Sequence, residues 1–178
     1  REVVLKELNP ALIGDVENLR RFVREGRTLV RLSHPNIVRA EGMFRDRGNH
    51  YLVLEYLTGG TLSDWTDRGR KMGLSRTAEI AIALCDALSY LHRSGIVHCD
   101  LNPSNVLFDA QGRPKLIDLG IAHIPDNLVH RRWRTQREVG VGTVPYMAPE
   151  QLDGVRDDPR IDMYALGMIA YQMLTGRY

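Results

Sequence analysis

The hydrophobic and polar positions of the first 57 residues follow a strand-like pattern interrupted by one helix. Residues 2–8 form a β-branched run that ends at an Asn-Pro pair, which predicts a strand. After Asp15, which suits a helix N-cap, apolar residues recur at helical spacing as far as Val30. Two apolar runs at 34–44 and 50–57 predict two more strands joined by a polar turn.

Beyond residue 57 the pattern becomes mainly helical. An apolar stripe from Ile80 to Leu91 predicts a helix, and Gly95 suits its C-terminal cap. The runs NVLF and PKLIDLG, separated by DAQG, predict a β-hairpin. From about Asp162 the sequence is apolar nearly all round, which predicts a helix inside a core. Strands that come first and helices that come later indicate an α+β fold.

Composition and charge narrow the class of protein. The chain has 178 residues, 43% of them hydrophobic and 26% charged, which is typical of one globular unit. A formal net charge of +2 argues against nucleic acid or an anionic membrane as the main partner. No apolar run reaches the roughly 18–20 residues of a membrane helix. Cys85 and Cys99 lack metal-ligand spacing and predict free thiols in a reducing, cytoplasmic compartment.

Acidic and amide side chains suited to phosphoryl transfer are concentrated in two short segments. HCDLNPSN contains Asp100 and Asn105, so that a carboxylate can accept a hydroxyl proton while an amide oxygen holds a metal ion. LIDLG places Asp118 just before a glycine, which suits a Mg²⁺ ligand, although an isolated Asp is more often a turn residue. His98 fits a buried scaffold residue better than a catalytic base.

A cation for the phosphates is available on the first predicted strand. Lys6 can pair with phosphate oxygens if its strand faces a cleft, but alone it is more often an ordinary solvated lysine. Glu25 on the following helix is the favoured partner for Lys6, because its neighbours Phe22 and Leu29 place that face against the core. Glu17 is the alternative partner, and an ordinary surface glutamate is the plainer interpretation of Glu25.

Together these segments resemble the protein kinase superfamily over nearly the whole chain. VVLK is similar to V-A-I-K, HCDLNPSN to H-R-D-L-K-P-x-N, DLG to D-F-G, and GTVPYMAPE to the end of the kinase activation segment. The sequence of these segments is most similar to that of bacterial serine/threonine kinases of eukaryotic type. The resemblance implies a bilobal fold, with a partial N-lobe and hinge over 1–57 and a partial C-lobe over 58–178.

The resemblance also implies roles for particular residues. Lys6 and Glu25 would form the ion pair of the active state, with ATP and Mg²⁺ as cofactors and a protein bearing Ser or Thr as substrate. Asp100 would be the catalytic base, oriented by Thr143, and Asp162 would anchor its loop. The remaining implied residues are the Mg²⁺ ligands Asn105 and Asp118, the gatekeeper Leu54, the hinge residues Glu55 and Leu57, and the adenine contacts Val4 and Leu107.

Two positions in the catalytic segment depart from the family pattern. Cys99 replaces the Arg that pairs with a phosphorylated activation loop, so control by loop phosphorylation is disfavoured. Asn102 replaces the Lys that stabilises the transferring phosphoryl group; an amide can donate a hydrogen bond there but brings no charge, which predicts a slow enzyme. The arginines at 131, 132, 134 and 137 suit either a solvated loop or recognition of an acidic substrate or regulator, and Thr135 is the obvious hydroxyl among them.

Three functions therefore remain open. The favoured one is an ATP- and Mg²⁺-dependent serine/threonine kinase, and the others are a pseudokinase that acts as a binding module and a small-molecule phosphotransferase. The segment from 142 to 151 favours a peptide substrate over a small molecule. No glycine-rich loop precedes Lys6 and no further helices follow Tyr178, so we expect a piece of a longer protein that binds ATP weakly by itself, and a parent chain with a membrane anchor elsewhere is compatible with this.

Overall fold

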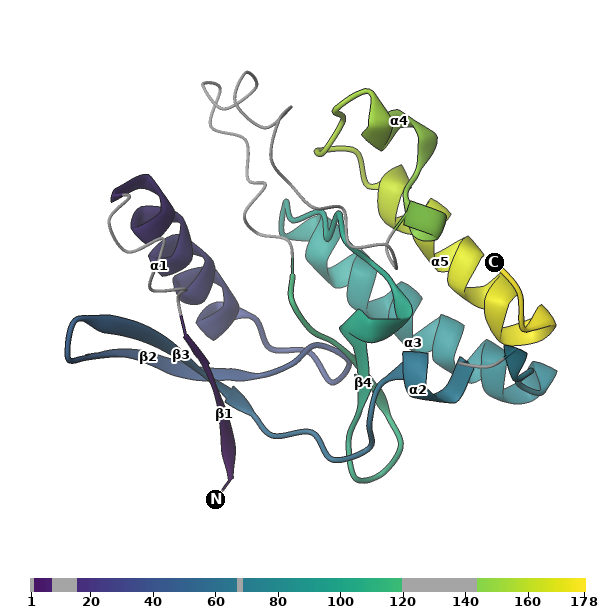
Figure 1. Cartoon of the computed structure of the whole chain (residues 1–178), viewed down its shortest axis with the longest axis horizontal. Coiled ribbons are helices and arrows are strands. Elements are labelled where there is room, and N and C mark those ends of the chain that lie inside the picture. The colour runs from purple at the N-terminus through teal and green to yellow at the C-terminus, as the bar shows by residue number, and fades with distance from the viewer. Residues whose placement is uncertain (1, 8–15, 67–68, 120–143) are drawn as a thin grey trace.

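The computed structural model of the chain describes residues 2–7, 16–66, 69–119 and 144–178 (Figure 1). A small antiparallel sheet with one long helix forms one part, and a group of helices forms the other. A short β-hairpin lies between the two parts in this view. The predicted α+β class is therefore observed, while the division into lobes at residue 57 stays a prediction.

The sheet has the strand order β1-β3-β2, with β1 at Val3–Glu7, β2 at Ala40–Asp46 and β3 at Asn49–Glu55. All neighbouring strands are antiparallel. The turn between β2 and β3 consists of Arg47 and Gly48, with φ angles of 47° and 89°. A two-residue turn with two positive φ values matches the twist of the flanking strands and sets their register, in which Asp46 faces Asn49.

Helix α1, Val16–Arg31, packs its apolar face on the sheet. Phe22 and Leu29 are buried, as their helical spacing predicts. Gly26 lies between them, and a Cβ atom at this position would collide with the side chain of Met43 on β2. A larger residue at position 26 would therefore require the flexible end of the Met43 side chain to move.

The segment from His34 to Arg39 is not the strand that its apolar residues predict, because β2 begins only at Ala40. It pairs instead with the hairpin strand β5, Pro114–Leu116. The backbone N–H of Val38 donates to Leu116 O at 2.8 Å, and Leu116 N–H donates to Asn36 O at 2.8 Å. The pairing partner lies about 80 residues away in sequence, so the local pattern contains no sign of it.

The helical part is built on α3, Leu74–Arg93, and α5, Arg160–Thr175, which lie against each other. Two short helices, α2 at Leu62–Thr66 and α4 at Pro149–Leu152, flank them. Strand β4, Val106–Phe108, pairs with β5 as the predicted hairpin. No helix in the described ranges combines the length and apolar character that crossing a membrane requires.

Helix α5 is only half buried, which corrects the prediction of a helix enclosed by core. One face, which includes Ile161, Ile169 and Met173, is fully buried in the common core. Tyr164 and Tyr171, on other faces, are 41% and 52% exposed. A sequence that is apolar all round shows that a helix can be buried on any side, but not which sides other elements cover.

Candidate active site

A buried carboxylate anchors the start of the predicted catalytic loop, residues 98–105. Asp162, near the start of α5, has no exposed surface. Its two oxygens accept hydrogen bonds from His98 N–H at 2.8 Å and Cys99 N–H at 2.9 Å, and Oδ2 contacts His92 Nε2 at 2.8 Å. The predicted anchoring role of Asp162 is thus observed, and it fixes the backbone immediately before Asp100.

His98 is a scaffold residue, as predicted. Its ring is fully buried, and Nε2 lies 3.1 Å from the backbone oxygen of Ile117. Because a carbonyl oxygen only accepts, Nε2 carries the proton, and Nδ1 is left to accept from Asp100 N–H at 3.4 Å. The imidazole therefore joins the catalytic loop to the segment before Asp118.

Asp100 and Asn105 are in direct contact. Asn105 Nδ2 donates to the backbone oxygen of Asp100 at 2.8 Å and to its carboxylate Oδ2 at 3.2 Å. The backbone oxygen of Asn105 accepts from Ile117 N–H at 3.0 Å. The loop with the candidate base and the segment with Asp118 are thereby tied together at Asn105.

Asn102 points into the loop, which corrects the expectation that its amide is available to the transferring phosphoryl group. Its Nδ2 donates to Asp100 O at 3.0 Å, and its Oδ1 accepts from Ser104 N–H at 2.9 Å. It is the N-cap of the short 3₁₀ helix η3, Pro103–Asn105. Both ends of the amide are used within the chain, because the tight turn offers it one backbone acceptor and one backbone donor.

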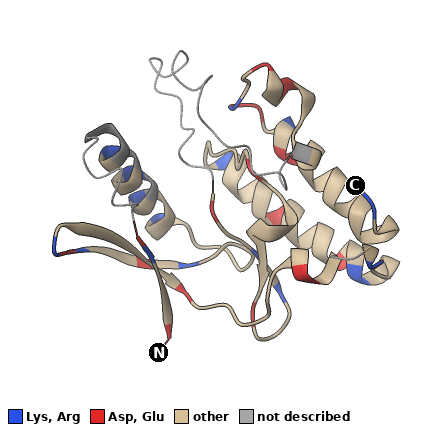
Figure 2. Cartoon of the chain, in the orientation of Figure 1, with Lys and Arg blue, Asp and Glu red and all other residues tan. Residues whose placement is uncertain are grey.

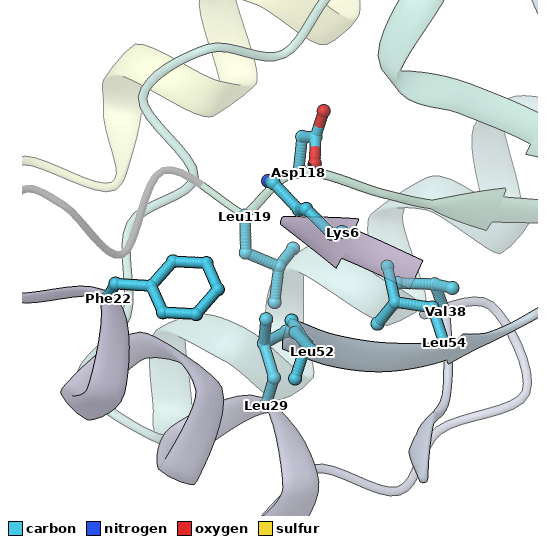
Figure 3. Close-up of a pocket in the computed structure, with 8 residues that line it drawn as sticks. All are labelled: Lys6, Phe22, Leu29, Val38, Leu52, Leu54, Asp118 and Leu119. Atoms are coloured by element: carbon cyan, nitrogen blue, oxygen red, sulfur yellow. Dashed lines mark hydrogen bonds and ion pairs between the residues drawn. The ribbon is translucent and has the colours of Figure 1, made fainter. Parts of the chain in front are cut away.

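Lys6 pairs with Asp118. Its Nζ lies 2.6 Å from Asp118 Oδ1, and the two side chains are 44% and 47% exposed (Figure 3). Glu25 and Glu17 lie within helix α1, but their side chains are outside the described part, so the predicted Lys6–Glu25 pair stays a prediction. The observed pair nevertheless places the candidate phosphate-binding cation directly beside the candidate metal ligand.

Apolar side chains close the back of this site. Figure 3 shows Phe22 and Leu29 of α1 facing Leu119, with Lys6 and Asp118 at the other side. The pocket between them has a volume of about 10 Å³, roughly the room for one water molecule. The inner end of the site between α1 and Leu119 is thus closely packed.

Glu55, the predicted hinge residue, forms a partly buried ion pair that the sequence does not indicate. Lys115 Nζ on β5 lies 2.8 Å from Glu55 Oε1, and the same oxygen accepts from Arg39 N–H at 2.8 Å. Lys115 and Glu55 lie 60 residues apart in the sequence, so no local pattern indicates that they pair. In the described ranges, the backbone N–H of Leu57 has no hydrogen-bond partner.

The other residues predicted to contact the nucleotide, or to guard its pocket, lie on strands β1, β3 and β4. Val4 on β1 faces Leu54 on β3 in the sheet register. Leu54 is buried, Val4 is exposed, and Leu107 on β4 is half-buried. Thr143 and the arginines 131, 132, 134 and 137, together with Thr135, lie outside the described residues.

Asn105 and Asp118 fit a divalent cation as ligands. Asn105 uses its Nδ2 within the loop, which leaves the amide oxygen Oδ1 for a metal, and Asp118 has its second carboxylate oxygen left. Among the described residues, no group of three or more His, Cys, Asp or Glu side chains is arranged to hold a metal alone. Asn105 and Asp118 would leave most of the coordination of a Mg²⁺ ion to phosphate oxygens and water, which Mg²⁺ commonly retains.

Cys99 is built into the same loop. Its Sγ–H donates to Arg156 O at 2.9 Å, and its backbone oxygen accepts from Gln151 Nε2 at 2.9 Å. Burial raises the pKa of the Cys99 thiol to about 12, and the charge of Asp162 adds to the rise. Cys99 is therefore a neutral structural thiol at physiological pH.

We expect Cys99 to resist alkylation in the folded protein. At pH 8 a thiol with a pKa of about 12 is a thiolate in only about one molecule in 10⁴, against roughly one in four for an ordinary thiol. The iodoacetamide reaction of Cys99, followed by mass spectrometry, should speed up about tenfold per pH unit well beyond pH 9. The exposed Cys85 serves as the internal reference. A rate at Cys99 that levels off below pH 9 would contradict this environment.

Comparison with known proteins identifies the family. The protein kinase domain model matches residues 1–178, so this chain belongs to the protein kinase family. It is 37% identical over 181 residues to the probable serine/threonine-protein kinase SCO3848 of Streptomyces coelicolor, covering 99% of this chain and 27% of that protein. It is 39% identical over 179 residues to the serine/threonine-protein kinase Pkn1 of Myxococcus xanthus, covering 98% and 25%.

A third similar protein comes from another bacterium. The serine/threonine-protein kinase PrkC of Bacillus subtilis is 33% identical over 177 residues, which cover 99% of this chain and 27% of PrkC. The chain thus spans about a quarter of the length of the curated relatives that it matches. The predicted resemblance to bacterial serine/threonine kinases is confirmed.

Proposed function

We propose that the protein is an ATP-dependent serine/threonine kinase that uses Mg²⁺ and has slow turnover. The main support is the tie between Ile117 N–H and Asn105 O, which brings the Asp100–Asn105 pair beside Asp118, itself in contact with Lys6. These contacts support a site in which a base, metal ligands and a phosphate-binding cation from separate elements act together. The serine/threonine kinases that the chain resembles support the same reaction and the same class of substrate.

Each side chain has a role in this proposal. Asp100 Oδ1, the carboxylate oxygen that Asn105 does not contact, accepts the proton of the Ser or Thr hydroxyl. The hydroxyl oxygen attacks the γ-phosphorus, and the bond from that phosphorus to the bridging oxygen breaks, so that ADP leaves. Lys6 binds phosphate oxygens once ATP competes for its contact with Asp118. Asn105 and Asp118 hold Mg²⁺, which when bound neutralises phosphate charge. Glu55 and Leu57 present backbone groups to adenine, which lies between Val4 and Leu107.

The direct test is transfer of labelled γ-phosphate from ATP and Mg²⁺ by the full-length protein to itself and to a generic protein acceptor. We expect label on Ser or Thr and its loss in Asp100→Asn. Label on a small hydroxyl compound in place of protein would point to the phosphotransferase alternative. No label in a folded protein that binds ATP would point to the pseudokinase alternative, for which the relatives give no support.

The environment of Asn102 predicts that a lysine there raises the rate. The native amide is neutral and its hydrogen bonds are made within the loop, so this position supplies no charge to the transferring phosphoryl group. A charged donor aimed at a transition state contributes about 10²–10³ in rate. Asn102→Lys should therefore raise kcat by about 10- to 100-fold. Loss of the cap should separately lower the free energy of unfolding by about 1 kcal/mol.

The matched control for this prediction is Asn102→Leu, which removes the cap and adds no charge. Initial rates under saturating ATP should fall for the leucine variant and rise for the lysine variant. Equal rates in the two variants would show that the loop does not direct this position toward the phosphoryl group.

We propose that this domain acts in the cytoplasm, since Cys85 and Cys99 are free thiols, and that it has no nucleic acid partner, since the net charge is only +2. The boundary between the two lobes is proposed at residues 57 and 58.

A further inference from the structure

Cys99, the residue before the proposed base Asp100, has an unusual backbone conformation. Its φ angle is 62°, in the left-handed region that residues with a side chain rarely adopt. Such a conformation persists only where the surrounding contacts fix it. Any relaxation at Cys99 would rotate the chain that carries Asp100, so the contacts that hold Cys99 also set the position of the Asp100 carboxylate.

The backbone of Cys99 is held on both sides. Before the residue, its N–H donates to the buried carboxylate of Asp162 at 2.9 Å. After it, its carbonyl oxygen accepts from Gln151 Nε2 at 2.9 Å. This carbonyl belongs to the planar peptide group that also contains the N–H of Asp100. The amide of Gln151 therefore fixes the plane of the peptide that leads into the base.

Gln151 is itself held in place. It is 4% exposed and is the one buried residue from Pro149 to Arg160, a stretch in which Figure 2 shows acidic and basic positions close together. Its Oε1 accepts from Ala148 N–H at 2.9 Å, and its backbone oxygen accepts from Arg156 Nη1 at 2.8 Å. A buried amide that uses both its oxygen and its nitrogen in hydrogen bonds has little freedom to move.

The two ends of this amide join segments that lie far apart in the sequence. The segment from 142 to 151, which contains Ala148, is the part of the sequence that indicates a peptide substrate. Gln151 Oε1 bonds within this segment, while Nε2 bonds to the catalytic loop 52 residues away. Because one planar amide makes both contacts, a displacement of the segment is passed on to the catalytic loop.

We propose that Gln151 is a positioning residue that couples this segment to the catalytic base. Its amide sets the orientation of the peptide between Cys99 and Asp100, and with it the direction of the Asp100 carboxylate toward the acceptor hydroxyl. This role rests on the proposed kinase reaction and concerns only its chemical step. In the described ranges, the side-chain hydrogen bonds of Gln151 reach neither Lys6 nor Asp118, so ATP binding should not depend on them.

The test compares Gln151→Glu and Gln151→Met in the full-length protein, with initial rates of phosphate transfer measured over a range of ATP concentrations. Gln151→Glu keeps an acceptor for Ala148 N–H but loses the donor to Cys99 O, and Gln151→Met loses both. Gln172→Glu is the matched control, because Gln172 is also buried and a carboxylate there keeps the acceptor for Tyr146 OH. Thermal melts record what each change does to the fold.

Both Gln151 variants should lower kcat about tenfold or more near neutral pH, while the KM for ATP changes by less than about twofold. The control should lose thermal stability but keep kcat within about twofold of the unmodified protein. As pH falls, kcat of Gln151→Glu should rise relative to that of Gln151→Met, because a protonated carboxyl group can again donate to Cys99 O.

A kcat that stays within about twofold in both Gln151 variants would overturn this role and leave the proposed kinase reaction standing. A fall in kcat that is matched in the control, and that follows the loss of thermal stability, would also overturn it, because Gln151 would then only support the fold. No transfer by the unmodified protein would instead overturn the proposed kinase reaction, and the role of Gln151 with it.

Discussion

Asp118→Asn should abolish measurable phosphate transfer, with a fall in kcat/KM of about 10³-fold or more. The change removes the charge from a candidate metal ligand and from the group that holds Lys6 at 2.6 Å. Loss of electrostatic stabilisation at a phosphoryl group is among the largest effects available to one side chain. The shape of the side chain is nearly unchanged, so the effect reports on charge.

The same variant should hardly change stability. Lys6 and Asp118 are both close to half exposed, and such surface pairs contribute about 0–1 kcal/mol. Rates measured beside a thermal melt separate the two quantities. Asp153→Asn, an exposed carboxylate at the end of α4, is the matched control and should behave as the unmodified protein. Transfer that continues in Asp118→Asn at more than a tenth of the original rate would remove Asp118 from the site.

Asp162→Ala should destabilise the fold by about 3–5 kcal/mol. The carboxylate is fully buried, and its loss leaves the N–H groups of His98 and Cys99 and the ring of His92 without their acceptor. Removing one member of a buried charged network typically has a cost of this size. Urea unfolding of the full-length protein, monitored by circular dichroism, measures the change.

Asp157→Ala is the control for this prediction, because Asp157 lies a few residues before Asp162 and is exposed. It should change stability by less than about 0.5 kcal/mol. If Asp162→Ala lost less than about 1 kcal/mol, the anchoring of the catalytic loop would have to come from other contacts, such as Gln151 Nε2 on Cys99 O.

The elements that local pattern specifies were predictable. The strand at Val3–Glu7, the helix at Val16–Arg31 and the hairpin of β4 and β5 each follow from the spacing of apolar residues and a turn signal. The contact between Asp100 and Asn105 also agrees with their spacing in one loop. The anchoring role of Asp162 came from resemblance, since no local pattern connects residues 64 positions apart.

Long-range pairing explains what local pattern missed. The apolar residues Ile37 and Val38 look like part of a strand, but their partner is β5. Lys115 looks like a surface lysine until the hinge residue Glu55 is placed beside it. Asn102 looks available to a substrate until the turn of the loop captures its amide. In each case a distant or backbone partner decides the outcome, and residue type alone does not name it.

We propose that this site transfers phosphate slowly and does more than bind a nucleotide. The most direct measurement is a single-turnover experiment in which the full-length protein exceeds labelled ATP and Mg²⁺, and rapid quenching compares the label in ATP with the label on Ser or Thr. We expect all bound label to move to Ser or Thr in one exponential phase that disappears in Asp100→Asn. Bound ATP that stays intact for as long in the unmodified protein as in Asp100→Asn would contradict it and make the chain a nucleotide-binding module.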